Sequence, residues 1–420
     1  MTKKEIAEIK KLLTPKNCSI TRICGCYVDG EKNKKTELKQ AFLALPEEEM
    51  FKYFEILRKV LSGTLGRNLL TLDFPLSLEM AGLTADAAAE VLPDVQVPGD
   101  ADTASSSRIN TESSNNTHEF LLRLRDSKLK DDTLLEAYYD KIIENYEYVG
   151  NYLILIIHDI YDVPGRTTDG LEMEDASDEI YEYILSCICP VELSKPGLSY
   201  DAEENTFRNR TRDWVVSLPE AGFLFPAFTD RSADIHSLLY YSKNSEELKE
   251  GFVEQLFGCP LPLSADSQKE TFQALIEDAL GEDCDIEVVK SIHDRFTELA
   301  EEHREAPEPL VLDKNEVKTI LADSGVANDK LDEFDRHYDE TAGENTSLLM
   351  SNVMNTRSFE VKTPDIVIKV NPERTDLIET RRINGRECLV IELDGGVIVN
   401  GIAVKTSSEK EVSENERGEE

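Results

Sequence analysis

The sequence has little positive charge, few histidines and tryptophans, and no long apolar run. Its 420 residues contain 46 Lys and Arg against 84 Asp and Glu, a net charge of −38, with six histidines and one tryptophan. The longest apolar stretch, Tyr152–Ile157, falls far short of the ~20 residues that span a bilayer. The charged N-terminal segment lacks the apolar core of a signal peptide. We therefore expect a cytoplasmic protein with no membrane partner and no general affinity for nucleic acid.

Several catalytic and ligand-binding patterns are also missing. The chain contains no Gly-x-Gly-x-x-Gly or Walker-type phosphate loop, no Gly-x-Ser-x-Gly, no His-Glu-x-x-His, no Glu-x-x-His and no EF-hand loop. Nucleotide-driven, serine-hydrolase, zincin, di-iron and calcium-binding chemistry therefore has no positive support. We expect no cofactor, and we favour a protein that is not an enzyme.

The charge that is present is unevenly distributed. Residues 1–70 carry 14 Lys and Arg against 9 Asp and Glu, whereas residues 71–358 carry 23 against 61. The stretch 359–405 is nearly neutral, with 7 against 8. A basic N-terminal segment followed by an acidic remainder indicates two surfaces with different partners, because charge asymmetry governs association rather than fold.

The hydrophobic pattern changes period along the chain, which predicts an α+β fold of mixed helices and antiparallel sheet. The dipeptide Pro164-Gly165 is a turn signal. We expect helices over residues 2–13, 47–61, 132–146 and 177–187, and strands over 18–28, 36–43, 152–157, 213–218, 222–228 and 235–241. The domains that we predict are a basic N-terminal α+β unit (1–83), a disordered linker or insertion (84–117), an α+β core (118–244), a helical segment (245–343), a small C-terminal β unit (344–405) and an acidic disordered tail (406–420).

Two Cys-x-Cys pairs, Cys24-Gly25-Cys26 and Cys187-Ile188-Cys189, are candidates for a metal site together with Cys18. In a strand, residues i and i+2 point to the same face, so both thiols of a pair could contact a soft metal. Structural zinc sites usually use wider Cys pairs. Buried cysteines acting as small apolar residues explain the pattern better, so we expect no metal.

A histidine next to a carboxylate ends the strand predicted at 152–157. His158 and Asp159 could act as a general base, and Asp230 and His236 lie in a second polar loop. The four residues are the candidates for a catalytic site, although His-Asp pairs at strand ends are more often ordinary hydrogen-bonding groups.

The basic N-terminal segment, residues 1–70, also contains a lysine-rich turn. Lys32, Lys34 and Lys35 lie in the turn, Lys39 follows, and Arg67 comes directly after a Gly-x-x-Gly segment. A glycine turn beside a basic residue can let a phosphate backbone approach closely. These five residues are the candidates for nucleic-acid contact, and a solvated turn with a glycine helix cap is the alternative.

Four segments of the sequence look familiar: Asn17–Lys32, Asp126–Asp132, Leu198–Tyr200 and Asp365–Arg374. On these segments the sequence resembles a family of uncharacterised proteins from anaerobic Gram-positive bacteria. The resemblance covers nearly the whole chain except residues 84–117, and it implies no active site because the family is a domain of unknown function. A fainter likeness, in the order of the elements only, is to the nucleoid-associated proteins of Gram-negative bacteria.

Taken together, the sequence favours a non-enzymatic protein that binds another macromolecule, most readily a protein. The basic N-terminal unit and the neutral C-terminal β unit are the expected contact surfaces. A nucleoid-associated or nucleic-acid-binding role is the first alternative, and an enzyme with a His/Asp site is the second.

Overall fold

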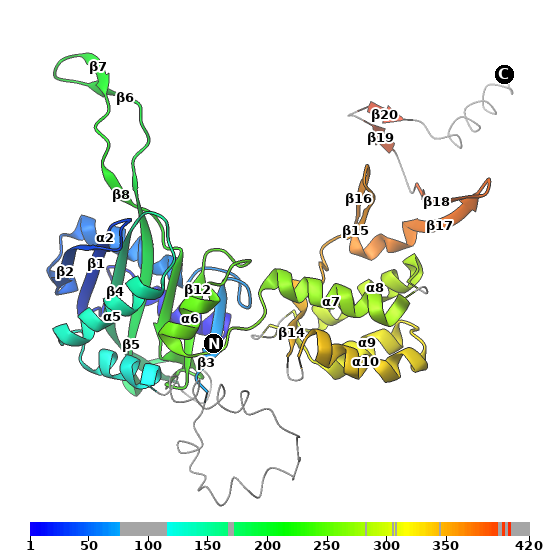
Figure 1. The fold of residues 1–420 in the computed structure, drawn as a ribbon, viewed down its shortest axis with the longest axis horizontal. Coiled ribbons are helices and arrows are strands. Elements are labelled where there is room, and N and C mark those ends of the chain that lie inside the picture. Colours follow the sequence, from blue (N-terminus) through cyan, green and yellow to red (C-terminus); the bar gives the residue numbers. More distant parts are fainter. Residues whose placement is uncertain are drawn as a thin grey trace, which may run out of the picture. The chain divides into compact units, whose positions relative to one another are not determined.

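The computed structural model describes residues 1–75, 116–166, 172–281, 284–304, 306, 309–343, 346–393, 397–399 and 402–404. The chain forms two compact units, the first chiefly from residues 1–267 and the second chiefly from residues 268–420 (Figure 1). The predicted insertion at 84–117 lies outside the described residues, except that a helix spans 116–126. The predicted tail at 406–420 also lies outside them.

The first unit is built on one antiparallel sheet with the strand order β2-β1-β4-β5-β9-β12-β3, and β8 pairs with β5 beside this path. Strands from the beginning of the chain therefore share a sheet with strands from residues 151–242. The strands are β1 (Arg22–Val28), β2 (Lys34–Gln40), β3 (Leu69–Asp73), β4 (Asn151–Arg166), β5 (Glu172–Leu193), β8 (Trp214–Val216), β9 (Ala221–Phe225) and β12 (Ser237–Ser242).

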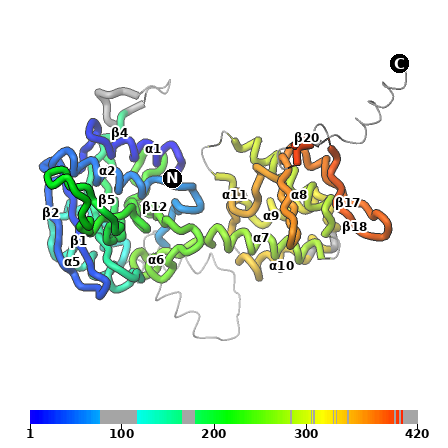
Figure 2. Tube along the Cα trace, turned by 90° about the horizontal axis from the view of Figure 1, so that it is seen from above, coloured from blue at the N-terminus to red at the C-terminus, as the bar shows by residue number. Residues whose placement is uncertain are grey.

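Helices cover both faces of this sheet (Figures 1 and 2). On one face, Ile154 and Ile156 of β4 pack in a core with the helix 116–126, α5 (Asp132–Asn145) and α6 (Glu250–Phe257). On the other face, Leu155 and Ile157 pack in a second core. That core includes α1 (Lys3–Leu12), η1 (Phe42–Ala44) and α2 (Glu47–Val60). A strand buried on both faces has no polar alternation, which explains the continuous apolar run of β4.

The predicted helix over 177–187 is wrong, because these residues lie in β5. This strand pairs with β4 from Asn151↔Val191 to Arg166↔Glu172. From Tyr183 to Val191, β5 is buried on both faces, so the apolar residues there fall at helical as well as strand spacings, and cross-strand pairing decides the outcome. The predicted turn at Pro164-Gly165 is also wrong: both residues belong to β4, where the register with β5 shifts.

The α+β class is confirmed, and most of the other predicted elements of the first unit are confirmed with small changes in their bounds. The strand predicted over 222–228 is divided, because β9 ends at Phe225 in the large sheet and residues 227–229 belong to a separate hairpin. The segment 194–213 leaves the sheet between β5 and β8 and forms a separate hairpin of β6 (Leu198–Asp201) and β7 (Thr206–Asn209). In Figure 1 this hairpin projects from the helix-covered sheet. A second small hairpin pairs β10 (Ala227–Thr229) with β11 (Ser232–Asp234).

The second unit combines helices with β hairpins, as predicted for this part of the chain. Buried Phe272, Phe296, Leu321 and Tyr338 contribute to its interior. No helix in the described part of either unit is long and apolar enough to cross a membrane. The elements are α7 (Ala265–Leu280), α8 (Ile286–Glu302), β13 (Val311–Leu312), α9 (Lys314–Asp323), α10 (Asn328–Thr341), β14 (Leu348–Leu349), α11 (Met350–Val353), β15 (Phe359–Lys362), β16 (Val367–Val370), η3 (Pro372–Leu377), β17 (Ile378–Ile383), β18 (Arg386–Ile391), β19 (Val397–Val399) and β20 (Ile402–Val404).

Candidate functional site

His158 and Asp159 are both buried in the sheet of the first unit, but they do not face each other. As neighbours in β4 they point to opposite faces. The ring Nδ1 of His158 is 2.7 Å from the hydroxyl of Thr21, and its Nε2 is 2.7 Å from a carboxylate oxygen of Glu182. Asp159 accepts a hydrogen bond of 2.7 Å from the hydroxyl of Tyr183. Each side chain therefore has its own partners.

Burial controls the ionisation of both side chains. It lowers the pKa of His158, and this effect outweighs the nearby Glu182 carboxylate, which raises it. The Thr21 and Glu182 contacts suit a neutral ring that accepts at Nδ1 and donates at Nε2. Burial raises the pKa of Asp159, and the hydrogen bond from Tyr183 opposes that shift. Both groups are thus enclosed in the sheet, each with its own hydrogen-bond partner.

The lowered pKa of His158 makes the stability of the first unit depend on pH. Because the unfolded chain takes up more protons than the folded chain below about pH 6.5, acid favours unfolding. We expect the free energy of unfolding, measured with denaturant, to fall between about pH 7.5 and about pH 5.5. His158→Gln removes part of this dependence. Exchange of the exposed residue in His303→Gln leaves the pH dependence unchanged, and an identical pH dependence in all three proteins contradicts the account.

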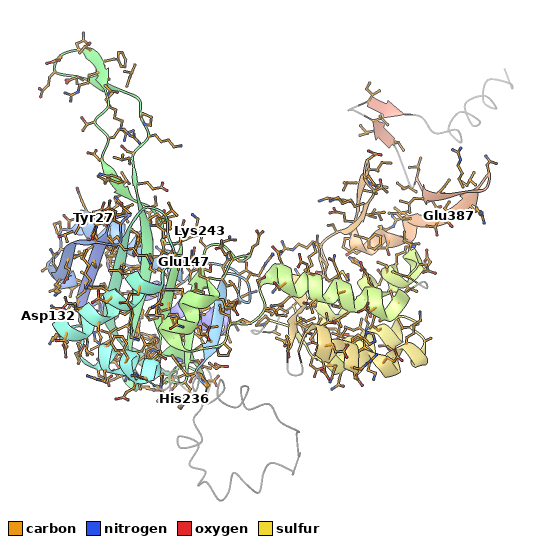
Figure 3. All side chains as sticks on the ribbon, viewed as in Figure 1. Tyr27, Asp132, Glu147, His236, Lys243 and Glu387 are labelled. Carbon is orange, nitrogen blue, oxygen red and sulfur yellow. The ribbon has the colours of Figure 1, made fainter. Side chains whose placement is uncertain are left out.

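The other two catalytic candidates lie elsewhere. Asp230 is in the turn between β10 and β11, where its backbone N–H donates to Glu5 at 2.7 Å. His236 is exposed (Figure 3), and its ring stacks on His118 with centroids 6.2 Å apart. Within the described residues, no hydrogen bond or ion pair joins Asp230 or His236 to His158 or Asp159. The structure therefore does not assemble the four candidates into one site.

The two Cys-x-Cys pairs are on opposite faces of the sheet. Cys24 and Cys26 belong to the core under α5, whereas Cys187 and Cys189 belong to the core under α2. Burial raises the pKa of Cys26 to about 11 and also raises the pKa of half-buried Cys18. Such thiols stay protonated at neutral pH and act as small apolar side chains. Over the described ranges, no group of three or more His, Cys, Asp or Glu side chains could hold a metal ion.

The lysines of the β1–β2 hairpin are engaged by neighbouring acceptors. Lys34 lies 2.6 Å from Asp140, Lys35 lies 2.6 Å from Asp29, and Lys39 lies 2.8 Å from Asp132. The remaining two candidates differ: Lys32 donates to the backbone carbonyl of Glu144 at 3.2 Å, and Arg67 is half-buried. Helix α5, which carries Asp132 (Figure 3) and Asp140, thus neutralises much of the expected nucleic-acid surface.

The hairpin of residues 194–213, which we call the arm, has one apolar face, and its side chains are exposed within the part of the chain that the structure describes. The cross-strand register places Leu198, Tyr200 and Phe207 on the same face. Their exposed fractions are 74%, 56% and 69%, and the rings of Tyr200 and Phe207 are 5.5 Å apart. The opposite face is polar, with Arg208 3.2 Å from Asp201. The arm is an amphipathic hairpin.

Exposed apolar residues continue at the root of the arm. Trp214, the only tryptophan of the chain, is 56% exposed in β8. Val215 and Val216 follow it and are also exposed. β8 pairs with the end of β5 through Val191↔Val216 and Leu193↔Trp214. Exposed apolar side chains are therefore present both on the arm and on the adjoining end of the sheet.

These features define an α+β protein with a helix-covered antiparallel sheet and an exposed hydrophobic arm, in which the four catalytic candidates do not converge on one site. The chain belongs to the family described as Domain of unknown function (DUF4317), whose model matches residues 1–94 and 107–402. The predicted resemblance to an uncharacterised family is thereby confirmed. The unmatched residues 95–106 fall within the stretch predicted to be an insertion. No curated protein matches the chain.

Proposed function

We propose that this protein is a non-enzymatic interaction protein that binds another protein through the arm. The observation that carries the proposal is the projecting hairpin with its uncovered apolar face. An isolated two-stranded hairpin is only marginally stable in water. A partner that covers Leu198, Tyr200 and Phe207 both stabilises the hairpin and removes its apolar surface from water.

The composition of the arm and its root supports a binding role. Tyrosine, tryptophan and arginine are the residues that most often dominate the energy of protein interfaces. The arm and root provide Tyr200, Trp214 and Arg210 together on one projection. Exposed apolar residues that occur singly need no explanation, whereas contiguous ones mark an interaction surface.

The charges favour a foreign protein over nucleic acid or a second copy of this chain. The arm contains four basic and four acidic residues, so it has no net charge. The whole chain has a net charge of −38, which repels a phosphate backbone and also an identical molecule. The partner that fits is a protein with an apolar groove, edged by carboxylates that can accept from Arg210.

A cross-linking experiment tests the proposal. A photoreactive amino acid replaces Phe207 in the full chain, and a matched protein carries it at Leu43, which is 65% exposed but lies away from the arm in η1. We expect a discrete protein adduct from position 207 in nuclease-treated lysate, and none from position 43. The captured protein, once purified, is expected to bind the unmodified chain.

Other outcomes overturn the proposal. Adducts that contain nucleic acid, or that disappear with nuclease, favour the nucleic-acid-binding alternative. Adducts with lipid place the arm on a membrane. Equal labelling from positions 207 and 43, or a captured protein that fails to bind in purified form, removes the arm as a contact element.

A further inference from the structure

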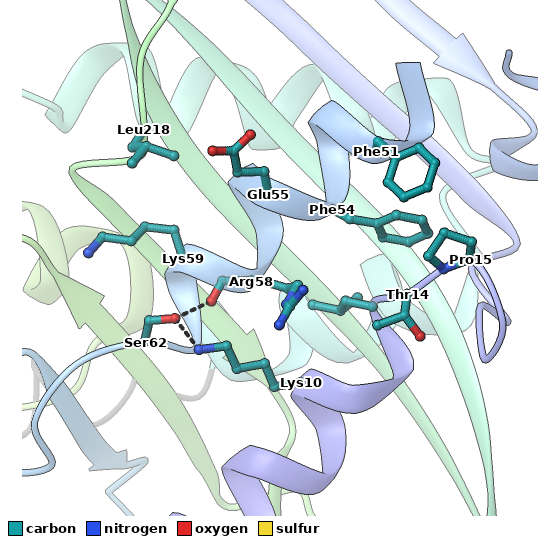
Figure 4. A pocket seen from close by; sticks show the side chains of 11 residues that line it. Lys10, Thr14, Pro15, Phe51, Phe54, Glu55, Arg58, Lys59, Ser62 and Leu218 are labelled. Atoms are coloured by element: carbon teal, nitrogen blue, oxygen red, sulfur yellow. Dashed lines mark hydrogen bonds between the residues drawn. The ribbon is translucent and has the colours of Figure 1, made fainter. Parts of the chain in front are cut away.

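A second candidate site is a cleft between α1 and α2, separate from the apolar face of the arm. Its volume is about 360 Å³, within the range of clefts that hold small molecules. Figure 4 shows its polar side chains reaching in from both helices. The lining residues are Lys10, Leu13, Thr14, Pro15, Phe51, Phe54, Glu55, Arg58, Lys59, Ser62 and Leu218.

Three cations line this cleft. Lys10 donates from its ammonium group to the hydroxyl of Ser62 at 2.5 Å, and that hydroxyl donates to the backbone carbonyl of Arg58. In the part of the chain that the structure describes, Lys10, Arg58 and Lys59 form no ion pair with a carboxylate. Burial lowers the pKa of Lys10, and the charges of Arg58 and Lys59 lower it further. By contrast, carboxylates pair with Lys34, Lys35 and Lys39 of the β1–β2 hairpin.

The helix ends near the cleft do not cancel this charge. α1 ends at Leu12 and α2 ends at Val60, so both present their C-terminal ends. Each end carries roughly −0.5 of a charge. The three cations and Glu55 give a formal charge of 3 − 1 = +2. About one positive charge therefore remains after both helix ends are counted.

The cleft also has an apolar wall. Phe51 and Leu218 are 50% and 44% exposed, and Pro15 is exposed between the helices. A phosphate ion alone would leave this wall in contact with water. A ligand that joins an oxyanion to an apolar group would satisfy both parts of the cleft.

We propose that the α1–α2 cleft binds a small organic oxyanion, a phosphate or carboxylate joined to an aromatic or aliphatic group. Lys10 and Arg58 donate charge-assisted hydrogen bonds to the oxyanion. The apolar group lies against Phe51 and Leu218. This site does not depend on the proposed function of the arm.

Calorimetric titration of the full chain with four probes tests the site. Phenyl phosphate and phenylacetate contain both parts of the proposed ligand and distinguish its two oxyanions. Inorganic phosphate lacks the apolar group, and benzyl alcohol lacks the charge. We expect saturable binding of at least one of the first two probes, at least about tenfold weaker binding of inorganic phosphate, and no binding of benzyl alcohol.

Matched variants locate the binding. Arg58 is exposed, so Arg58→Gln leaves the fold intact and is expected to weaken binding about tenfold, whereas Arg58→Lys loses less. Lys3→Gln removes an exposed charge elsewhere on α1 and changes binding less than about twofold. No saturable binding of either complete probe overturns the proposal. Equal effects of Arg58→Gln and Lys3→Gln overturn it too, because they show a general response to charge.

Discussion

Gly222→Ala is expected to lower the free energy of unfolding of the first unit by about 2–3 kcal/mol, because it overpacks the sheet. A β-carbon at this position would lie 2.6 Å from the backbone oxygen of Ser186 and 2.9 Å from a methyl group of Val60. The oxygen belongs to the neighbouring strand β5, and Val60 is the last residue of α2. Neither the sheet nor the helix can move away without losing packing.

Gly197→Ala is the matched control for this substitution. Gly197 lies in the arm, and a β-carbon there would meet no atom within 4 Å. Denaturant unfolding of both variants, followed by circular dichroism, measures the difference. We expect Gly197→Ala to change the free energy of unfolding by less than about 0.5 kcal/mol. Similar stabilities of the two variants would show that α2 does not pack on β9 as described.

The second large effect is expected at the arm. Tyr200→Ser combined with Phe207→Ser should weaken binding to the cross-linked protein partner about 100-fold. Truncation of one central aromatic residue commonly costs more than 1 kcal/mol of binding free energy, and about 1.4 kcal/mol corresponds to a tenfold change. The free energy of unfolding should stay nearly unchanged, because both side chains are more than half exposed.

Leu43→Ser controls for the loss of exposed apolar surface in general. Leu43 is 65% exposed in the first unit but lies outside the arm. Its substitution should leave the dissociation constant within about twofold of the wild-type value. If the double arm variant and Leu43→Ser weaken binding equally, the contact is not specific to the arm.

Local patterns predicted most of the elements in the first unit. The helices at 47–61 and 132–146 follow apolar spacing, and the structure has them as α2 and α5. The helix predicted over 177–187 is wrong because this segment, from Tyr183 onward, is buried on both faces of the sheet and shows no polar alternation. Its partner β4 determines its structure, and that pairing is a long-range property.

For the candidate site residues, too, local sequence predicts some features and not others. That His158 and Asp159 point to opposite faces follows from their positions in one strand. That Lys34 and Lys39 are neutralised does not follow from local sequence, because Asp140 and Asp132 are brought to them by α5. The local sequence around a lysine does not predict whether a helix distant in the sequence will bring a carboxylate to it.

The arm and the cleft were missed for related reasons. Leu198, Tyr200 and Phe207 have the composition of ordinary strand residues, and only the fold shows that nothing covers them. The turn dipeptide Pro196-Gly197, which lies between β5 and the hairpin, was a weak sequence signal that the chain leaves the sheet there. Lys10 and Arg58 each lie in the last turn of an amphipathic helix, where basic residues are common. Their shared cleft depends on the packing of α1 beside α2.

The most direct test of the interaction function uses a chain without the arm. The backbone N–H of Ser194 donates to the carbonyl oxygen of Asp213 at 2.8 Å, so an Asn-Gly turn can replace residues 195–212. The measurement is the dissociation constant of wild-type and arm-less chains for the purified cross-linked protein, by calorimetry. We predict that the arm-less chain unfolds at the wild-type denaturant midpoint but shows no binding. Binding of the folded arm-less chain with wild-type affinity would contradict the proposed function.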